Sequence, residues 1–162
     1  MDKTELPDCN RILPRLYQGA APPADATLML YGFNVLVLCA IEYQPKRELF
    51  GGVTVLRCPF GDNYDVRLTS VERRLIFDTS ARVIRALRAG ARTYVSCAMG
   101  LNRSGLVNAL VVRDMTGSSG REARQWVQSR RPGALQNPHF GLLLDGLART
   151  HADRRELRID RG

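Results

Sequence analysis

Two residues able to carry out covalent chemistry stand close together in the stretch Tyr94–Val112, YVSCAMGLNRSGLVNALVV. Cys97 ends a short apolar run, and Arg103 follows six positions later, just before a long apolar run. This pattern predicts a loop between a buried strand and the first turn of a helix. Such a loop can direct several backbone N–H groups to one point, where the helix dipole adds positive potential. The loop is therefore predicted to bind an anion of the size of phosphate.

The chemistry of the two side chains agrees with a phosphate site. A cysteine at a helix N-terminus next to a cation favours the thiolate, which is the nucleophilic form. The planar guanidinium of Arg103 can bind two phosphate oxygens at once. We therefore expect phosphoryl transfer to Cys97. Arg103 and the loop amides supply the charge stabilisation, so no metal and no cofactor is expected. The predicted substrate-binding residues are Ala98, Met99, Gly100, Leu101, Asn102 and Arg103.

The elements that must position this loop can be read from the periodicity of apolar residues. Residues 12–20, 34–40, 53–58 and 92–96 are typical of strands, and 34–40 has the continuous apolar run of a strand covered on both faces. Helices are predicted from Ser70 to near Gly90, over 104–115, from Ser119 to about Ser129, and from Asn137 onward. Strands mixed with helices predict a layered α/β fold.

Length and composition predict one domain over residues 1–162, with a charged tail at about 150–162. The net charge of +8 suits acidic partners such as phosphoproteins, RNA or anionic lipid. Four cysteines lie far apart and only two histidines are present, so a zinc site is not expected. No run resembles a secretory signal, a membrane span or a lipid anchor. We expect a cytoplasmic protein with reduced thiols.

The segment from Cys97 to Ser104 matches the C-x5-R-[ST] signature of cysteine-dependent phosphatases in the protein tyrosine phosphatase superfamily. Residues 12–20, ILPRLYQGA, look like the first strand of dual-specificity phosphatases, and Gly117–Phe140, with RPGALQNP, is similar to their segment after the signature helix. The resemblance implies a compact domain with a central, mainly parallel sheet flanked by helices. One residue departs from the family pattern, because Ser96 stands where a histidine usually helps to order the loop and tune the thiolate. We still expect an active enzyme.

The resemblance also implies a general acid, because an alkoxide or phenoxide leaves poorly without a proton. CPFGDNYD, residues 58–65, resembles the PFxD acid loop of the phosphatases of regenerating liver. Asp62 matches the acid and Asp65 is the alternative. In the implied cycle Cys97 attacks phosphorus, Asp62 protonates the leaving oxygen, and Asp62 then activates water. Ser104 can donate a hydrogen bond to the departing thiolate.

A redox role is implied for Cys39, at the end of the strand predicted over 34–40. In the phosphatases of regenerating liver, a cysteine at the matching place forms a disulfide with the nucleophile. A neighbouring thiol can trap an oxidised nucleophile before oxidation goes further. An inert buried cysteine is an equal alternative.

The substrate is expected to be a phosphoprotein carrying phosphotyrosine, phosphoserine or phosphothreonine, hydrolysed by a monomeric enzyme. The loop has no lysine or arginine before Arg103, which argues against polyphosphoinositides. One alternative is an RNA 5′-triphosphatase, since GLNRSG is close to the G-x-N-R-T-G form of cysteine-type RNA phosphatases and the chain is basic. Nucleic acid is a partner only under that alternative. The other alternative is a phosphate-binding pseudophosphatase, which the presence of Ser96 in place of the usual histidine suggests.

Overall fold

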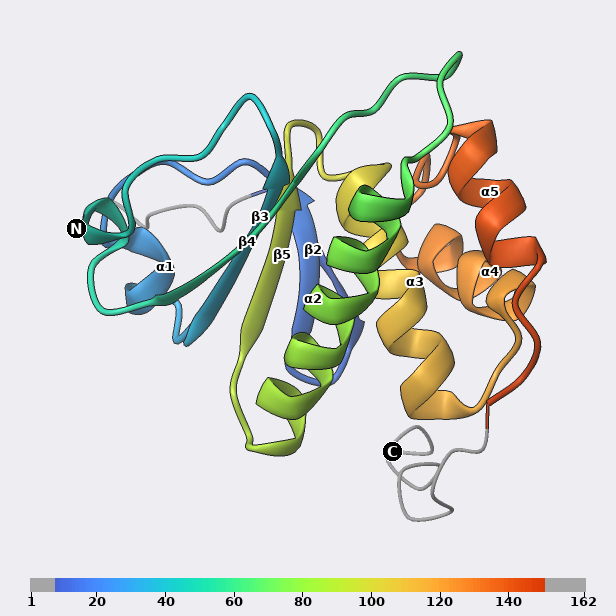
Figure 1. Cartoon of the computed structure of the whole chain (residues 1–162). Helices are drawn as coiled ribbons and strands as arrows, with labels where there is room; N and C mark the ends of the chain where they lie inside the picture. The colour runs from blue at the N-terminus through green and yellow to red at the C-terminus, as the bar shows by residue number, and fades with distance from the viewer. Residues whose placement is uncertain (1–7, 151–162) are drawn as a thin grey trace.

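The computed structural model describes residues 8–150, whose centre is a five-stranded sheet with strand order β1-β2-β5-β3-β4 (Figure 1). Strand β1 is antiparallel to β2, and the other neighbours are parallel. The predicted α/β fold with a mainly parallel sheet flanked by helices is therefore confirmed. The tail predicted at 150–162 lies, beyond Thr150, outside the described residues. The strands are β1 (Cys9–Leu13), β2 (Leu16–Ala20), β3 (Val35–Ala40), β4 (Thr54–Phe60) and β5 (Thr93–Cys97).

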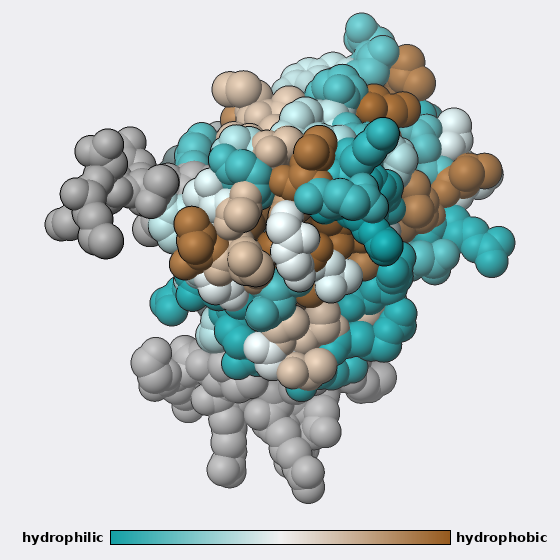
Figure 2. Space-filling view, turned by 90° about the vertical axis from the view of Figure 1, so that its left-hand side faces the viewer, coloured by the Kyte–Doolittle hydropathy of each residue, from teal (hydrophilic) through white to brown (hydrophobic). Residues whose placement is uncertain are grey.

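The two faces of the sheet are covered unequally. The helices of its larger side are α2 (Ser70–Arg88), α3 (Arg103–Thr116), α4 (Gly120–Arg130) and α5 (Pro138–Asp145). Within residues 8–150, the other side carries only the four-residue α1 (Thr27–Leu30) and the 3₁₀ turn η1 (Arg47–Phe50). Figure 2 looks onto that thinner side, where apolar side chains are interspersed among polar ones. No helix among residues 8–150 is long and apolar enough to cross a bilayer.

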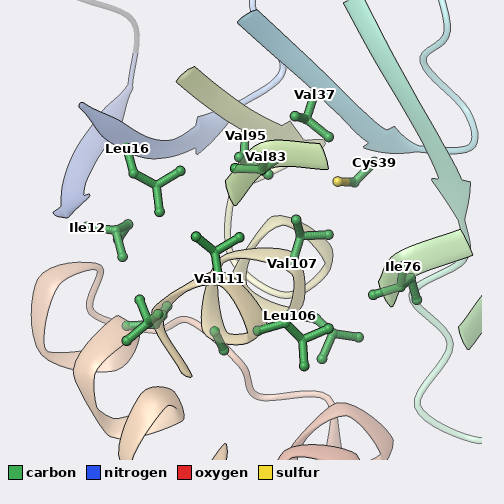
Figure 3. Packing of buried hydrophobic residues seen from close by; sticks show 14 of the residues in the cluster. Ile12, Leu16, Val37, Cys39, Ile76, Val83, Val95, Leu106, Val107 and Val111 are labelled. Atoms are coloured by element: carbon green, nitrogen blue, oxygen red, sulfur yellow. The ribbon is translucent and has the colours of Figure 1, made fainter. Parts of the chain in front are cut away.

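Alternation along the central strands builds a core on each face, because successive strand residues point to opposite sides. Val37 and Cys39 of β3 and Val95 of β5 face the α3 side, and Figure 3 shows Val107 and Val111 of α3 pointing toward the sheet. Leu36 and Leu38 of β3 and Tyr94 of β5 join the smaller cluster under α1 and η1. Every residue of β3 and β5 is buried, as the continuous apolar run predicts for β3.

Local signals place most helix ends within a residue of the prediction. Thr69, rather than the predicted Ser70, caps α2, because its hydroxyl accepts the Glu72 amide while Glu72 bonds back to the Thr69 amide. Ser119 caps α4 and Asn137 caps α5, as predicted. The apolar spacing within 70–90 also predicts that Val71 faces the core, and this is wrong: Val71 lies in the first turn of α2 and is 76% exposed.

The segment 12–20, predicted as one strand, is a hairpin of β1 and β2. Pro14 cannot donate to a strand ladder, and Arg15 has φ +64°. The Arg15 guanidinium donates to the carbonyl of Leu87 at 3.0 Å, which holds the turn against the end of α2. The chain therefore reverses after Leu13, and β2 runs parallel to β5.

The carboxyl ends of four parallel strands meet at one edge of the sheet, which is where α/β proteins bind ligands. Strand β5 leads there into the segment before α3, β3 into Ile41 and Glu42, and β4 into the segment before α2. Figure 1 shows these connections gathered at the upper end of the sheet. Three segments far apart in the sequence are thus brought to one place.

Candidate active site

The phosphate loop, residues 97–103, joins β5 to α3, as predicted. Cys97 is only 3% exposed, and its sulfur lies 3.2 Å from the hydroxyl oxygen of fully buried Ser104. A hydroxyl at this distance can donate a hydrogen bond to a thiolate.

Two buried side chains behind the loop bind its carbonyl groups. Arg131 donates from Nε to the carbonyl of Gly100 at 2.8 Å and from Nη2 to that of Met99 at 2.9 Å. Gln18 donates to the same Gly100 carbonyl at 3.0 Å, and its own side-chain oxygen accepts from Asn108 at 3.2 Å. Arg131 is in turn paired with Asp8 at 3.0 Å. These donors hold the loop's carbonyl oxygens on its rear side.

Backbone donors hold the adjacent carbonyls. Those of Ala98 and Leu101 accept from the amides of Ala21 and Leu135, each at 3.3 Å. In a trans peptide the N–H points opposite to the C=O, so the next amides along the loop face forward. Within residues 8–150, the backbone N–H groups of 98–103 donate to no protein atom. The loop thus presents unclaimed amide donors, the arrangement expected of an anion cradle.

The loop touches β2 backbone to backbone at Gly100. This glycine has φ +68°, and a Cβ there would lie 2.1 Å from the carbonyl carbon of Gly19. A Cβ at Gly19 would in turn lie 2.4 Å from the carbonyl oxygen of Asp8. No larger residue fits either position without moving backbone.

Arg103 is 5% exposed and held mainly by Glu42. Its Nη1 and Nη2 donate to the two Glu42 carboxylate oxygens at 2.6 and 2.5 Å, and Nη1 also donates to the carbonyl of Phe60 at 3.1 Å. Its Nε is buried and lacks a partner within the described chain. An unpartnered buried guanidinium N–H is costly unless a ligand accepts it, so Nε is available for an oxyanion.

The charges around Arg103 are mutually stabilising. Hydrogen bonds from Arg103 lower the pKa of Glu42 from 4.5 to about 2. Burial alone would lower the pKa of Arg103, but its bonds to Glu42 and the nearby charges of Cys97 and Asp62 raise it overall. The guanidinium therefore keeps its positive charge beside the cysteine.

The acid loop, residues 61–69, connects β4 to α2 and meets the phosphate loop at Asp62. One Asp62 carboxylate oxygen accepts from Asn137 at 2.8 Å, and the other accepts from Asn102 at 3.0 Å. Asn102 also donates to the hydroxyl of Tyr64 at 3.0 Å and accepts from the amide of Gln136 at 2.8 Å. Asp65 makes no such contact, since only its backbone amide is engaged, with Asn63. Asp62, and not Asp65, is therefore joined to the phosphate loop.

Known proteins are similar to this chain in sequence and in fold. No protein-family model matches the chain. Human dual specificity phosphatase 28 is 33% identical over 135 residues, which cover 83% of this chain and 74% of that protein. The mouse protein of the same name is 31% identical over 145 residues, covering 89% and 86%.

The solved structure of human DUSP28 aligns with a TM-score of 0.71 and 30% identity, over 86% of this chain and 92% of that one. The chain belongs to the dual-specificity phosphatases.

Within this family, Ser96 departs from the pattern but is structurally satisfied. Its hydroxyl donates to the carbonyl of Val37 on β3 at 2.9 Å, and the side chain is 1% exposed. The serine is thus bonded to the sheet rather than to the phosphate loop. Its effect on the rate stays a prediction.

All four cysteines are free thiols. Burial raises the pKa of the Cys39 thiol, and a hydrogen bond with Cys58 and the proximity of Cys97 add to this. Cys39 therefore has two sulfur neighbours, of which the sequence indicated one. Pairing of Cys39 with Cys97 stays a prediction.

The sequence interpretation missed four residues that hold the site: Gln18, Glu42, Arg131 and Asn137. Glu42 carried a usable signal, since a carboxylate two residues after a buried strand lies at the ligand-binding edge. Gln18 and Arg131 carried none, because each looks like an ordinary polar residue until the fold buries it. Among residues 8–150, no three His, Cys, Asp or Glu side chains gather as metal ligands would.

Proposed function

We propose that this dual-specificity phosphatase is catalytically active and hydrolyses phosphotyrosine, phosphoserine and phosphothreonine in proteins through a phosphocysteine intermediate. The observation that carries the proposal is the set of unclaimed donors around Cys97. The amides of 98–103 and Nε of Arg103 lack acceptors within the described chain. A tetrahedral dianion supplies these acceptors.

In the first step the Cys97 thiolate attacks phosphorus, a P–S bond forms and the P–O bond to the substrate breaks. Asp62 gives a proton to the departing oxygen. Arg103 and the amides stabilise the charge on the three other phosphoryl oxygens. Bonds from Asn102 and Asn137 hold Asp62 beside the phosphate loop.

In the second step a water molecule attacks the phosphocysteine, and Asp62 takes a proton from it. The P–S bond breaks and inorganic phosphate forms. Cys97 leaves as the thiolate, which the neighbouring Ser104 hydroxyl stabilises as a hydrogen-bond donor. The cycle needs no redox change and returns every residue to its starting state.

The loop itself supports a singly phosphorylated group as substrate. The side chains of Ala98, Met99 and Leu101 carry no charge, and Met99 is 69% exposed at the rim. A polyphosphorylated sugar headgroup would meet no basic side chain from this loop except Arg103. Protein phosphomonoesters fit such a site better.

The test is turnover of para-nitrophenyl phosphate and of phosphotyrosine and phosphothreonine peptides. Cys97→Ser should lower turnover by about 10⁴-fold or more while oxyanion binding remains, because the amides and Arg103 are unchanged. Arg103→Lys should be nearly inactive, since an ammonium cannot form a planar fork. Cys9→Ser, on the half-buried outer strand β1, is the matched control and should keep wild-type turnover.

Mass spectrometry of rapidly quenched enzyme should find one phosphate on Cys97. Preferred cleavage of 5′-triphosphorylated RNA would favour the RNA alternative. Oxyanion binding without turnover of any substrate would favour the pseudophosphatase alternative. The single domain, the cytoplasmic location and the monomeric state stay predictions.

A further inference from the structure

A second groove lies beside the acid loop, between that loop, the start of α2 and the start of α5. Its volume is about 460 Å³. Three basic side chains line it, one from each of these segments, and three leucines form its apolar part. They are Arg67, Arg73 and His139, with Leu68, Leu142 and Leu143.

The basic side chains of this groove are not engaged by the protein. In the part of the chain that the structure describes, Arg67, Arg73 and His139 form no side-chain hydrogen bond or ion pair. Glu72, the acid adjacent to Arg73, bonds to Thr69 instead, at 3.2 and 3.0 Å.

Some other arginines are paired with carboxylates. Arg124 is bonded to Asp145, and even exposed Arg74 lies 4.0 Å from Asp78. The groove thus concentrates positive charge without a matching carboxylate, and so it favours an anion.

Two residues of the groove are close in sequence to residues of the catalytic centre. Arg67 is five residues from Asp62, and an extended chain of that length spans at most ~17 Å. His139 is two residues from Asn137, which bonds to Asp62 directly. A substrate peptide could therefore connect the two sites with two to five residues, at ~3.4 Å per residue.

We propose that this groove binds a second phosphate of the substrate protein, on a residue two to five positions from the one hydrolysed. The guanidinium of an arginine can donate two parallel hydrogen bonds to phosphate oxygens, and a phosphate carries more charge than a carboxylate. An apolar side chain next to the second phosphoresidue packs on Leu142, which is 70% exposed. The inference rests on the proposed function, because it takes the hydrolysed phosphate to lie at Cys97.

The test measures binding to the Cys97→Ser variant, so that turnover does not enter. The probes are synthetic peptides with one phosphotyrosine and a phosphothreonine placed two, three, four or five positions away. At least one spacing should bind about tenfold tighter than the peptide with phosphotyrosine alone. Equal affinity at every spacing overturns the proposal. Replacement of the phosphothreonine by glutamate should lose most of the gain, and full retention by glutamate overturns the phosphate assignment.

The gain must depend on the groove. Arg67→Ala combined with Arg73→Ala should reduce the ratio of doubly to singly phosphorylated affinity to about one. Arg74→Ala, the neighbour outside the groove, should leave the ratio unchanged. A ratio that survives the double substitution overturns the proposal.

Single-stranded RNA that binds wild type and loses its affinity in the Arg67→Ala and Arg73→Ala double variant, when no peptide spacing shows a gain, also overturns it. Failure of the proposed function gives a different result, namely no turnover of para-nitrophenyl phosphate by wild type while the affinity ratio persists.

Discussion

The two loops that meet at Asp62 are built in opposite ways. The phosphate loop has four successive carbonyls bound from behind, and Cys97, Gly100, Asn102 and Arg103 are buried. The acid loop has six successive exposed residues, 62–67, and its link to the phosphate loop is the pair Asn102 and Asp62, with Tyr64 beside it.

This difference follows from what each loop must do. An oxyanion cradle works because its donors are fixed before charge develops, so its scaffold has to be rigid. A general acid needs only to bring one proton within hydrogen-bond reach of the leaving oxygen. A lightly held loop is enough for that, and it leaves room for substrates of different shape.

Of the changes that test this comparison, the largest effect is expected in the acid loop. Asp62→Asn removes the proton donor and should lower kcat for phosphopeptides by about 10²- to 10³-fold. Substrates whose leaving groups need no proton should lose much less, and the basic limb of the pH–rate profile should flatten. Asp65→Asn is the matched control, because it makes the same change from carboxylate to carboxamide in the same loop, at a residue without a contact to the phosphate loop. If Asp65→Asn shows the leaving-group effect instead, Asp62 is not the acid.

The next largest effect is expected when the phosphate loop loses one of the side chains that hold it. Arg131→Met leaves the carbonyl of Met99 without its side-chain donor and that of Gly100 with Gln18 alone, which should lower the free energy of unfolding by about 2–4 kcal/mol. The displaced amides should lower kcat/KM by about 10- to 100-fold and weaken oxyanion binding with it. Urea unfolding and vanadate inhibition measure the two effects.

Arg130→Met is the control for this change, because Arg130 stacks on Trp126 and donates to the Ser129 hydroxyl, and the structure of residues 8–150 gives it no bond to the phosphate loop. Its loss should cost about 1 kcal/mol or less. Unchanged vanadate inhibition in Arg131→Met would show that the loop keeps its shape without this anchor.

A smaller effect is expected from a change at Asn137 that removes its bond to Asp62 but keeps the cap of α5. Asn137→Ser keeps a hydroxyl that can cap the helix but loses the amide that donates to Asp62. Phosphopeptide turnover should fall about tenfold, roughly one hydrogen bond to a charged group. The dependence of rate on leaving-group acidity should steepen, which a purely structural role would not cause. The slope is measured with a series of aryl phosphates.

The smallest effect concerns Glu42 and pH. Its pKa is lowered from 4.5 to about 2 in the folded protein by the bonds from Arg103. This stabilisation is complete above pH 4.5 and is lost as the pH falls toward 2. Because the Glu42 side chain is 52% exposed, the loss should not exceed about 1 kcal/mol. Glu42→Gln should abolish that part of the pH dependence of urea unfolding, and Asp78→Asn, on the surface of α2, should retain it.

Much of the fold could be predicted because its signals are local. Short windows of sequence show the continuous apolar run of β3, the caps at Ser119 and Asn137, and the switch from strand to helix across Cys97. The hairpin of β1 and β2 was not predicted, because the turn at Pro14 and Arg15 depends on a contact with Leu87, far along the chain.

The same limit applies to the site. The signature Cys97–Ser104 is contiguous, so its residues could be named from the sequence. The groups that hold it come from β2, the end of β3 and the segment after α4, and only the folded sheet brings them together. Neither could the sequence reveal that Ser96 bonds to the Val37 carbonyl instead of supporting the phosphate loop.

The contact between Gly19 and Gly100 restricts how this site can be redesigned. Each glycine is held by a backbone group, so no change of side chain elsewhere can make room for a larger residue at either place. In a library built to change substrate preference, variation at position 100 or 19 would return mostly misfolded clones. Exposed Ala98 and Met99, by contrast, project no side chain into that contact and can be varied freely. Evolution toward a new substrate is therefore confined to two adjacent codons of the loop and to the exposed residues around it.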